Sequence, residues 1–381
     1  MTSTRGRLCA ALAVTLVVLA SPTATAQAAV PTGGASAVLS RMTLAQRVGQ
    51  LFMVGTPATA AGSSTLSAIS AYHVGNIMLT GRSHDGTAAV AAVTGALSAR
   101  VTTSSTYGVP LFIGTDQEGG LVQVLSGPGF STMPTALTQG TWSPTNLRTW
   151  ATTWGRQLRT AGVNVNLAPV MDTVPLAYAA YPPIGYYRRE FGHTTSVVAS
   201  HGTAFVAGMS TAGVVATAKH FPGLGRVTAN PDTTSRVTDR VTVRHDAYLW
   251  PFAAAVSYGV PFLMMSTAYY QRIDPYHPAA FSPTIIGGMV RGDLAFRGVV
   301  ISDDLSNAVQ VAAWSPASRA LQFINAGGDM ILATNPAVLP AMYGAVLARA
   351  QANAAFLSKV DASALRVLTA KQNRGLIPRA T

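Results

Sequence analysis

The sequence predicts a single-domain α/β protein, specifically a (β/α)8 barrel of the TIM type. Eight short apolar runs are spaced along the chain, each about as long as a strand that is buried on both faces of a sheet. Ala-rich segments with helical character separate most of these runs, and this alternation is typical of a parallel sheet. The 381 residues also suit a barrel, because single barrels commonly run to about 250 residues or more. An open, doubly wound sheet is the alternative.

Residues 1–29 have the features of a secretion signal peptide. Arg5 and Arg7 form a positive start, an apolar stretch follows over 8–20, and small residues over 24–28 offer cleavage sites. The apolar stretch is short for a membrane-anchoring helix, which is the alternative. We therefore expect a secreted protein, located outside the cell or at the cell wall. The only cysteine, Cys9, lies in this segment, so the exported chain would contain no disulfide.

The rest of the chain divides into a short linker over 30–37 and one barrel domain over 38–381. The expected strands are 51–54, 75–79, 110–114, 163–168, 214–218, 262–265, 298–301 and 329–332. The clearest expected helices are 43–50, 87–99, 147–161 and 194–211. We found no internal repeat and no linker to a second domain.

The charge balance is basic, with a formal net charge of +12. The basic residues are scattered and form no run, which argues against a nucleic-acid partner. A basic exported protein can be attracted to an anionic cell wall, although net charge that serves solubility explains the composition equally well. We expect a monomer.

Polar and ionisable residues follow four of the apolar runs, at 115–120, 169–172, 219–223 and 302–305. In a barrel, the residues that follow the strands meet at one face, where active sites lie. Since the chain has only 14 acidic residues, this gathering of carboxylates points to a site.

Each of these residues has a chemical use and a structural alternative. Asp303 can attack an anomeric carbon, while its neighbour Asp304 suits a helix cap. Asp116 can accept hydrogen bonds from two sugar hydroxyls, or it can form an ion pair that orders a loop. Lys219 and His220 are suitable donors to sugar hydroxyls, or they are structural groups with satisfied hydrogen bonds.

Six sequence blocks in order carry a family resemblance. They are residues 42–52, 116–120, 168–172, 219–223, 281–283 and 298–305. On these blocks, from about residue 38 to about residue 340, the chain resembles the family-3 glycoside hydrolases. It is most similar to the single-domain bacterial β-N-acetylglucosaminidases that act on peptidoglycan fragments. The resemblance implies a (β/α)8-like barrel, in agreement with the pattern of apolar runs.

The resemblance also implies retaining hydrolysis of β-linked N-acetylglucosamine in a carbohydrate substrate, with no metal and no organic cofactor. The family's nucleophile matches Asp303, and its sugar-binding aspartate matches Asp116. Its lysine and histidine match Lys219 and His220, and an arginine that the family uses matches Arg189.

The chain departs from the family pattern at two places. Leu121 and Val124 stand where the family has arginines, so part of the sugar-binding site is rebuilt or missing. In the loop after the fifth expected strand, Asp232 matches an aspartate of the family, but Thr234 replaces the histidine that acts as general acid and base, and Leu224 replaces a second histidine. A threonine hydroxyl cannot donate a proton near neutral pH.

We therefore expect Asp232 to act as the acid and base if its surroundings raise its pKa. His193 and His245 are the alternatives for this role. The leading hypothesis is a secreted retaining glycosidase that uses Asp303 and Asp232. The competing ones are a glycan-binding protein without catalysis, and a family member that acts on another β-linked sugar or transfers glycosyl groups to phosphate.

Overall fold

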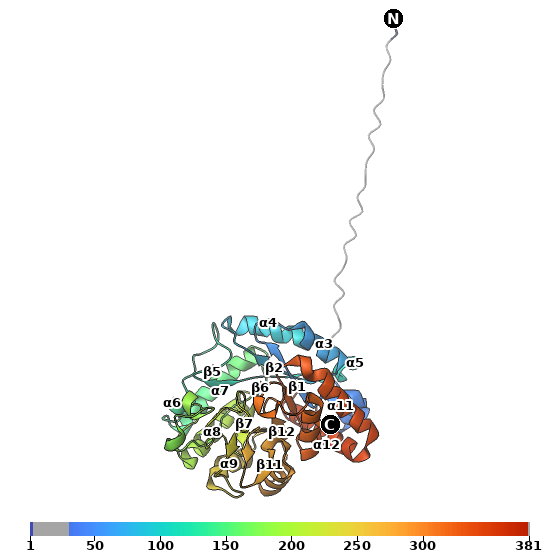
Figure 1. Cartoon of the computed structure of the whole chain (residues 1–381). Coiled ribbons are helices and arrows are strands. Elements are labelled where there is room, and N and C mark those ends of the chain that lie inside the picture. The colour runs from blue at the N-terminus through green and yellow to red at the C-terminus, as the bar shows by residue number, and fades with distance from the viewer. Residues whose placement is uncertain (3–29, 380–381) are drawn as a thin grey trace.

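The computed structural model describes residues 1–2 and 30–379, so the predicted signal peptide lies almost entirely outside the described residues. Within 30–379, eight parallel strands form a barrel surrounded by helices (Figure 1). The barrel strands are β1 Phe52–Pro57, β2 Asn76–Thr80, β3 Phe112–Thr115, β6 Val165–Asn166, β7 Val215–Phe221, β9 Phe262–Met265, β12 Val299–Ser302 and β13 Ile331–Ala333.

The strands follow one another round the barrel in chain order. β1 pairs with β13 on one side and with β2 on the other, and Ile301 of β12 bridges to Met330, which directly precedes β13. This last contact closes the ring, so the open-sheet alternative is excluded. Every one of the eight apolar runs contributes one barrel strand, and the predicted (β/α)8 fold is confirmed.

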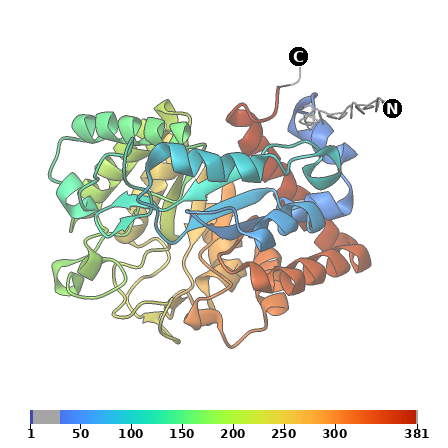
Figure 2. The same ribbon diagram turned by 90° about the horizontal axis from the view of Figure 1, so that it is seen from above.

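The helices pack outside the barrel, as the view from above shows (Figure 2). The α-helices are α1 Gly34–Arg41, α2 Leu44–Gly49, α3 Ser63–Ala71, α4 Gly86–Ser98, α5 Thr103–Thr106, α6 Ala136–Gln139, α7 Pro144–Thr160, α8 Thr195–Thr211, α9 Trp250–Tyr258, α10 Pro316–Ala326, α11 Leu339–Ala352 and α12 Ala354–Asn373. A π-helix, η5, spans Thr284–Asp293. The short 3-10 helices are η1 Leu176–Tyr178, η2 Gly185–Tyr187, η3 Ala247–Leu249, η4 Ala279–Phe281, η6 Val309–Val311 and η7 Pro336–Val338. None of the helices in the described part of the chain is both long and apolar enough to cross a membrane.

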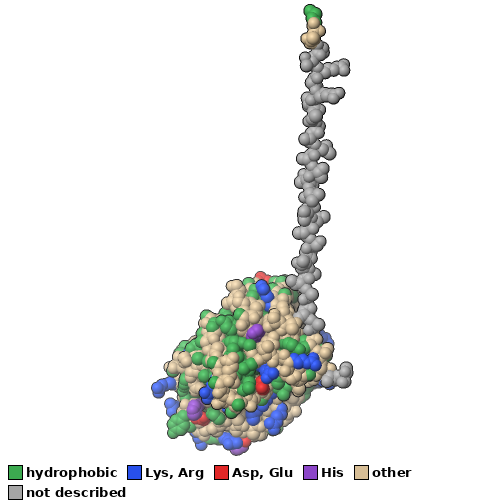
Figure 3. Space-filling model, turned by 90° about the vertical axis from the view of Figure 1, so that its right-hand side faces the viewer, with side chains coloured by type: hydrophobic (Ala, Val, Ile, Leu, Met, Phe, Trp, Pro, Cys, Tyr) green, Lys and Arg blue, Asp and Glu red, His purple; other side chains and the backbone are tan. Residues whose placement is uncertain are grey.

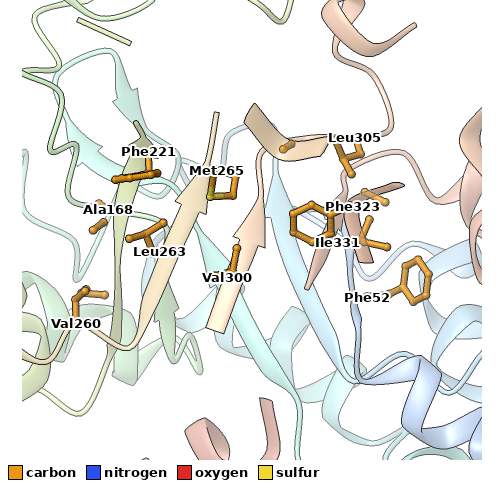
Figure 4. Close-up of a cluster of buried hydrophobic side chains, with 14 of the residues drawn as sticks. Phe52, Ala168, Phe221, Val260, Leu263, Met265, Val300, Leu305, Phe323 and Ile331 are labelled. Atoms are coloured by element: carbon orange, nitrogen blue, oxygen red, sulfur yellow. The ribbon is translucent and has the colours of Figure 1, made fainter. Parts of the chain in front are cut away.

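Side chains of the barrel strands alternate between two apolar layers. In β9, Phe262 and Met264 point into the barrel, whereas Leu263 and Met265 belong to the layer beneath the helices. Figure 4 shows part of the outer layer, where Val300 and Phe323 of α10 are among the buried side chains. The alternation explains why each strand reads as a continuous apolar run, because both of its faces are buried.

Helix α1 begins at Gly34, within the segment 30–37 that the sequence predicts to be a linker. Ala35 and Val38 of this helix are buried in a small apolar cluster that includes Leu368 of α12. The backbone N–H of Ala35 also donates to the Gln372 side chain at 2.6 Å. Tertiary packing against α12 therefore makes a helix of a segment whose local sequence suggests a linker.

Two small additional sheets lie beyond the ends of the barrel strands. β4 Gln117–Gly119 and β5 Val122–Gln123 form a hairpin directly after β3. A three-stranded sheet joins β8 Thr238–Asp239, which follows β7, to β10 Tyr269–Tyr270 and β11 Asp274–Pro278, which follow β9. Both additions lie at the C-terminal face, where the predicted site residues are.

Candidate active site

One cavity of about 250 Å³ opens at the C-terminal face of the barrel. Side chains from the ends of several strands and from two loops line it. The lining residues are Asp116, Val122, Leu167, Pro183, Arg189, Lys219, His220, Leu224, Asn230, Pro231, Asp232, Met264, Asp303 and Leu332. All six predicted site residues are among them. Apolar side chains from the barrel interior complete the lining, namely Leu167, Met264 and Leu332.

Asp303 and Asp304 separate into two environments. The backbone of Asp303 continues the pairing of β12 with β9, since its N–H donates to the Met265 carbonyl at 2.9 Å, and its half-buried side chain lines the cavity. The Asp304 carboxylate instead accepts hydrogen bonds from Ser306 and Thr334, from both the backbone and the hydroxyl of each. Asp303 is thus the carboxylate that is available to a ligand, and Asp304 holds the loop in place.

Lys219 lies between two carboxylates. Its ammonium nitrogen is 2.6 Å from Asp116 Oδ1 and 2.6 Å from Glu118 Oε1. Burial alone would lower the pKa of Lys219, but the negative charges of Asp116 and Glu118 outweigh burial and raise it. The lysine therefore stays charged, while Asp116, whose side chain is 29% exposed, still presents its carboxylate to the cavity.

Arg189 reaches the cavity from the loop that follows β6 and is anchored by Glu118. Its Nε and Nη2 atoms each lie 2.8 Å from a different oxygen of the Glu118 carboxylate. Burial alone would raise the pKa of Glu118, but the charges of Arg189 and Lys219 and their hydrogen bonds outweigh it and hold this pKa at about 2. Glu118 thus stays ionised and fixes two cations on the cavity wall.

His220 is oriented by Asp172, a fully buried aspartate after β6. The imidazole Nδ1 lies 2.8 Å from Asp172 Oδ2, and Asp172 Oδ1 accepts hydrogen bonds from the backbone N–H groups of His220 and Leu224. These contacts leave Nε2 of His220, which is 3.5 Å from Arg189, as the ring nitrogen at the cavity. Asp172 therefore aligns the ring and the loop that follows it.

Asp232 enters the cavity from the loop after β7, together with Asn230 and Pro231. The loop is held from outside, because the N–H of Val309 donates to the Asp232 carbonyl at 3.1 Å. Although the residue as a whole is exposed, crowding of the Asp232 carboxyl by protein atoms raises its pKa to about 6, and the negative charge of Asp303 adds to this rise. A carboxyl group with this pKa is partly protonated near pH 6 and can donate a proton there.

Thr234 and the two alternative proton donors, His193 and His245, lie away from the cavity. Thr234 is exposed and does not line the cavity. The ring of His193 bonds to the Val174 carbonyl at 2.9 Å, and exposed His245 faces Asp293 beside a separate cavity. Neither histidine is among the cavity-lining residues. The ionisable groups that share the cavity with Asp303 are Asp116, Arg189, Lys219, His220 and Asp232.

A further carboxyl group, Glu190, is buried directly beside the site. Its side chain follows Arg189, is 1% exposed, and neither of its oxygens has a hydrogen-bond partner within residues 30–379. Burial raises the pKa of Glu190 to about 7, with a smaller contribution from the negative charge of Asp172. The group is therefore neutral over much of the acidic range.

Glu118 and Asp172 lie within the motifs 116–120 and 168–172, but neither is among the site residues predicted from the sequence. Both residues follow barrel strands, so the same positional argument that selected Asp116 and Asp303 applies to them. Among residues 30–379, no group of three or more His, Cys, Asp or Glu side chains is arranged to hold a metal ion. Chemically, the cavity offers the carboxylates of Asp303 and Asp116, a third carboxyl group, Asp232, that can hold a proton near pH 6, and several donors for hydroxyl groups.

Comparison with known proteins gives a consistent result. The model of the glycosyl hydrolase family 3 N-terminal domain matches residues 43–370. A β-hexosaminidase of Stenotrophomonas maltophilia strain K279a is 33% identical over 264 residues, which cover 67% of this chain and 76% of that protein. The crystal structure of a β-N-acetylhexosaminidase from Beutenbergia cavernae is 56% identical with a TM-score of 0.86, and covers 87% of this chain and 98% of that one.

A family 3 β-N-acetylglucosaminidase from Paenibacillus sp. FPU-7 is 31% identical with a TM-score of 0.80. The match covers 88% of this chain and 63% of the Paenibacillus chain. The region 43–370 that the family model matches includes every residue that lines the cavity.

Proposed function

The chain belongs to glycosyl hydrolase family 3 and is a glycoside hydrolase that acts on O-glycosyl bonds, and on this premise we propose that it is a secreted retaining β-N-acetylhexosaminidase. Its substrates would be glycans with β-linked N-acetylglucosamine, such as peptidoglycan fragments. One observation carries this proposal: the Asp303 carboxylate shares a small polar cavity with Asp116, Lys219 and His220 and with the protonatable Asp232.

In the proposed reaction, Asp303 attacks the anomeric carbon and forms a covalent glycosyl-enzyme while the glycosidic oxygen departs. Asp232 donates its proton to that oxygen, and then accepts a proton from the water that hydrolyses the intermediate. Asp116, Lys219, His220 and Arg189 hold the hydroxyl groups of the sugar. Their fixed positions favour catalysis, because contacts made before substrate binds restrict them: Glu118 pairs with Lys219 and Arg189, Asp116 pairs with Lys219, and Asp172 holds His220.

Secretion and the cellular location also belong to the proposal. The support for export is the charge and length pattern of residues 1–29. Removal of Arg5 and Arg7 with the signal peptide would lower the formal net charge from +12 to +10, and this positive charge favours approach to an anionic cell wall. Lys and Arg side chains are spread over the face drawn in Figure 3 and do not gather in one patch, which fits weak association with a polyanion better than a dedicated binding site. We further propose that the protein is a monomer.

The decisive experiment is release of the aryl alcohol from an aryl N-acetyl-β-glucosaminide, compared between wild type and Asp303→Asn. We expect the variant to lose at least about 10³-fold in kcat. Asp361→Asn is a matched control, because it removes a carboxylate that pairs with Arg47 away from the cavity. A fluorinated substrate that traps the covalent intermediate, followed by mass spectrometry of peptides, should place the label on Asp303.

Label on Asp304 would overturn the assignment of the nucleophile. The replacement of the family histidine by Thr234 favours one second candidate, a glycan-binding protein without catalysis. Wild-type protein that binds N-acetylglucosamine but releases no aryl alcohol would support that candidate and refute the enzyme.

A further inference from the structure

A second, larger groove lies next to the site cavity and has no part in the chemistry described above. It has a volume of about 820 Å³ and is formed by segments that follow barrel strands β7, β9 and β12, so it opens at the same C-terminal face. Its walls combine Arg236 and Arg240 with Tyr269, Tyr276 and Trp314. We call it the Arg236 groove.

We propose that the Arg236 groove binds the leaving-group side of an acidic glycan substrate, with its arginines recognising a carboxylate on a sugar ring. This inference rests on the proposed function, because it assigns the groove to the part of the substrate beyond the bond that is cleaved.

The charge of the groove favours an anionic ligand. Arg236 is exposed and makes no ion pair within residues 30–379, and Arg240 is bound only through Gln271, at 2.9 Å. No acidic residue lines the groove. The nearby carboxylate of Asp239 is fully buried and accepts hydrogen bonds from Val241 and Thr242. Two arginines therefore face the groove with no acid to neutralise them, and guanidinium groups suit planar carboxylates.

The aromatic side chains of the groove favour a sugar. Tyr276 of β11 is 83% exposed, an unusual state for a large aromatic side chain. Trp314 is half-buried on the opposite segment and is supported by Phe281, with the ring centroids 5.4 Å apart. Aromatic rings that are apolar on their faces and polar at one end suit ligands with both kinds of surface. An acidic oligosaccharide presents both, whereas a plain anion would leave Tyr276 unexplained.

The position of the groove links it to catalysis. A single loop separates it from the site cavity, since Asn230, Pro231 and Asp232 line the cavity while Ser235 and Arg236 line the groove. The four peptide units that join Asp232 to Arg236 span at most roughly 14 Å, a distance that a short oligosaccharide can cover.

The loop between the cavity and the Arg236 groove is held in place by hydrogen bonds. The side-chain oxygen of Gln310 accepts a hydrogen bond from the Val237 N–H at 2.9 Å, and its side-chain nitrogen donates to the Val237 carbonyl at 3.1 Å. The backbone N–H of Gln310 donates to the Pro231 carbonyl at 3.0 Å. A glycan that leaves the cavity past Asp232 would therefore meet the groove at a defined position.

The test compares an acidic with a neutral tetrasaccharide. The acidic probe contains alternating N-acetylglucosamine and N-acetylmuramic acid, and the neutral probe is chitotetraose. Binding is measured by calorimetry on the mature protein carrying Asp303→Asn to prevent turnover. Adding Arg236→Gln and Arg240→Gln should weaken binding of the acidic probe about 10-fold and leave chitotetraose unaffected. The difference should disappear near 1 M salt, where the Debye length falls to about 3 Å.

Arg148→Gln with Arg156→Gln is the matched control, because it removes the same charge from the exposed side of α7. Tyr276→Ala should weaken binding of both tetrasaccharides. On the aryl glucosaminide, the Arg236 and Arg240 variants should match wild type in kcat/KM.

Equal binding of the acidic probe by the groove variants and their parent would overturn the inference, and so would an equal loss with chitotetraose or with the α7 control. The inference can fail independently of the proposed function. If wild type hydrolyses the aryl substrate but the arginines do not matter, only the groove assignment fails. If the arginine-dependent binding is present but no aryl alcohol is released, the groove stands as a glycan site and the proposed enzyme fails.

Discussion

Arg189 and Glu118 form a two-pronged ion pair, in which two guanidinium nitrogens each lie 2.8 Å from a separate carboxylate oxygen. Lys219 bonds to the same carboxylate at 2.6 Å. The Glu118 side chain is 3% exposed and that of Arg189 is 16% exposed. One enclosed carboxylate thus holds two cations, Lys219 from strand β7 and Arg189 from the loop after β6, and the substrate-binding wall depends on it.

The first prediction concerns Glu118→Gln. The amide cannot neutralise two cations, and breaking a buried pair by removing one partner costs about 3 to 5 kcal/mol. We expect a loss of about 3 kcal/mol in the free energy of unfolding, measured by urea denaturation, together with a lower kcat/KM on the aryl substrate. Asp361→Asn, which breaks the more exposed pair with Arg47, should cost less than about 1 kcal/mol. Equal losses for the two variants would contradict this role of Glu118.

The second prediction concerns Asp172→Asn, which disturbs the alignment of His220. The amide NH2 group cannot accept a hydrogen bond, so at least one of the contacts with His220 or Leu224 is lost. Hydrogen bonds to charged groups contribute about 1.5 to 3 kcal/mol. We expect kcat/KM to fall about 10- to 100-fold, with the free energy of unfolding measured alongside. Unchanged kinetics in a folded variant would show that the orientation of His220 is unimportant.

Much of the site could be predicted because strand ends are visible in a sequence. The apolar runs locate the barrel strands, and the residues that follow them, Asp116, Lys219, His220 and Asp303, converge on one cavity as expected. Asp304 has a structural role, as expected, but it does not cap a helix: its carboxylate accepts hydrogen bonds from Ser306 and Thr334 in the loops after β12 and β13.

Other features depend on tertiary contacts that no local pattern reports. The partner of Arg189 is Glu118, 71 residues away in the chain, and the sequence places no constraint on that distance. Helix α1 forms against α12 at the opposite end of the chain. The pKa of Asp232 is raised by burial in its loop and by the charge of Asp303, and both causes depend on the folded positions of these groups. Each of these is a consequence of barrel closure, which brings distant segments together.

The third prediction concerns Asp232 as acid and base. Because its pKa is raised to about 6, the proton needed by the leaving group is present below pH 6 and is lost as the pH rises through that value. For a disaccharide with a poor leaving group, kcat/KM of wild type should therefore fall above about pH 6. Asp232→Asn should lose about 10² to 10⁴-fold on this substrate and much less on an activated aryl glycoside.

The measurement is the pH profile of kcat/KM for both substrates. The fall above pH 6 should vanish in Asp232→Asn, and added azide should restore turnover of the activated substrate by replacing water in the second step. Thr234→Ala is the matched control in the same loop and should resemble wild type. An unchanged alkaline limb in Asp232→Asn would assign the proton donor to another group.

The last prediction concerns Glu190 and the dependence of stability on pH. Its pKa is about 7 in the folded protein against 4.5 ordinarily: burial raises it most and Asp172 adds to the rise, while the backbone N–H of Glu190 itself, Arg188 and Arg189 oppose it. Below pH 4.5 the carboxyl is protonated in both folded and unfolded states and costs nothing. Between pH 4.5 and 7 the unfolded chain releases this proton and the folded protein retains it, so wild type loses stability as the pH rises. Glu190→Gln removes the titration. The free energy of unfolding of the variant minus that of wild type should therefore be up to about 3 kcal/mol larger at pH 8 than at pH 4. Urea denaturation of both proteins at these two pH values measures the gain, and a difference that is the same at both would show that Glu190 is not held protonated by its burial.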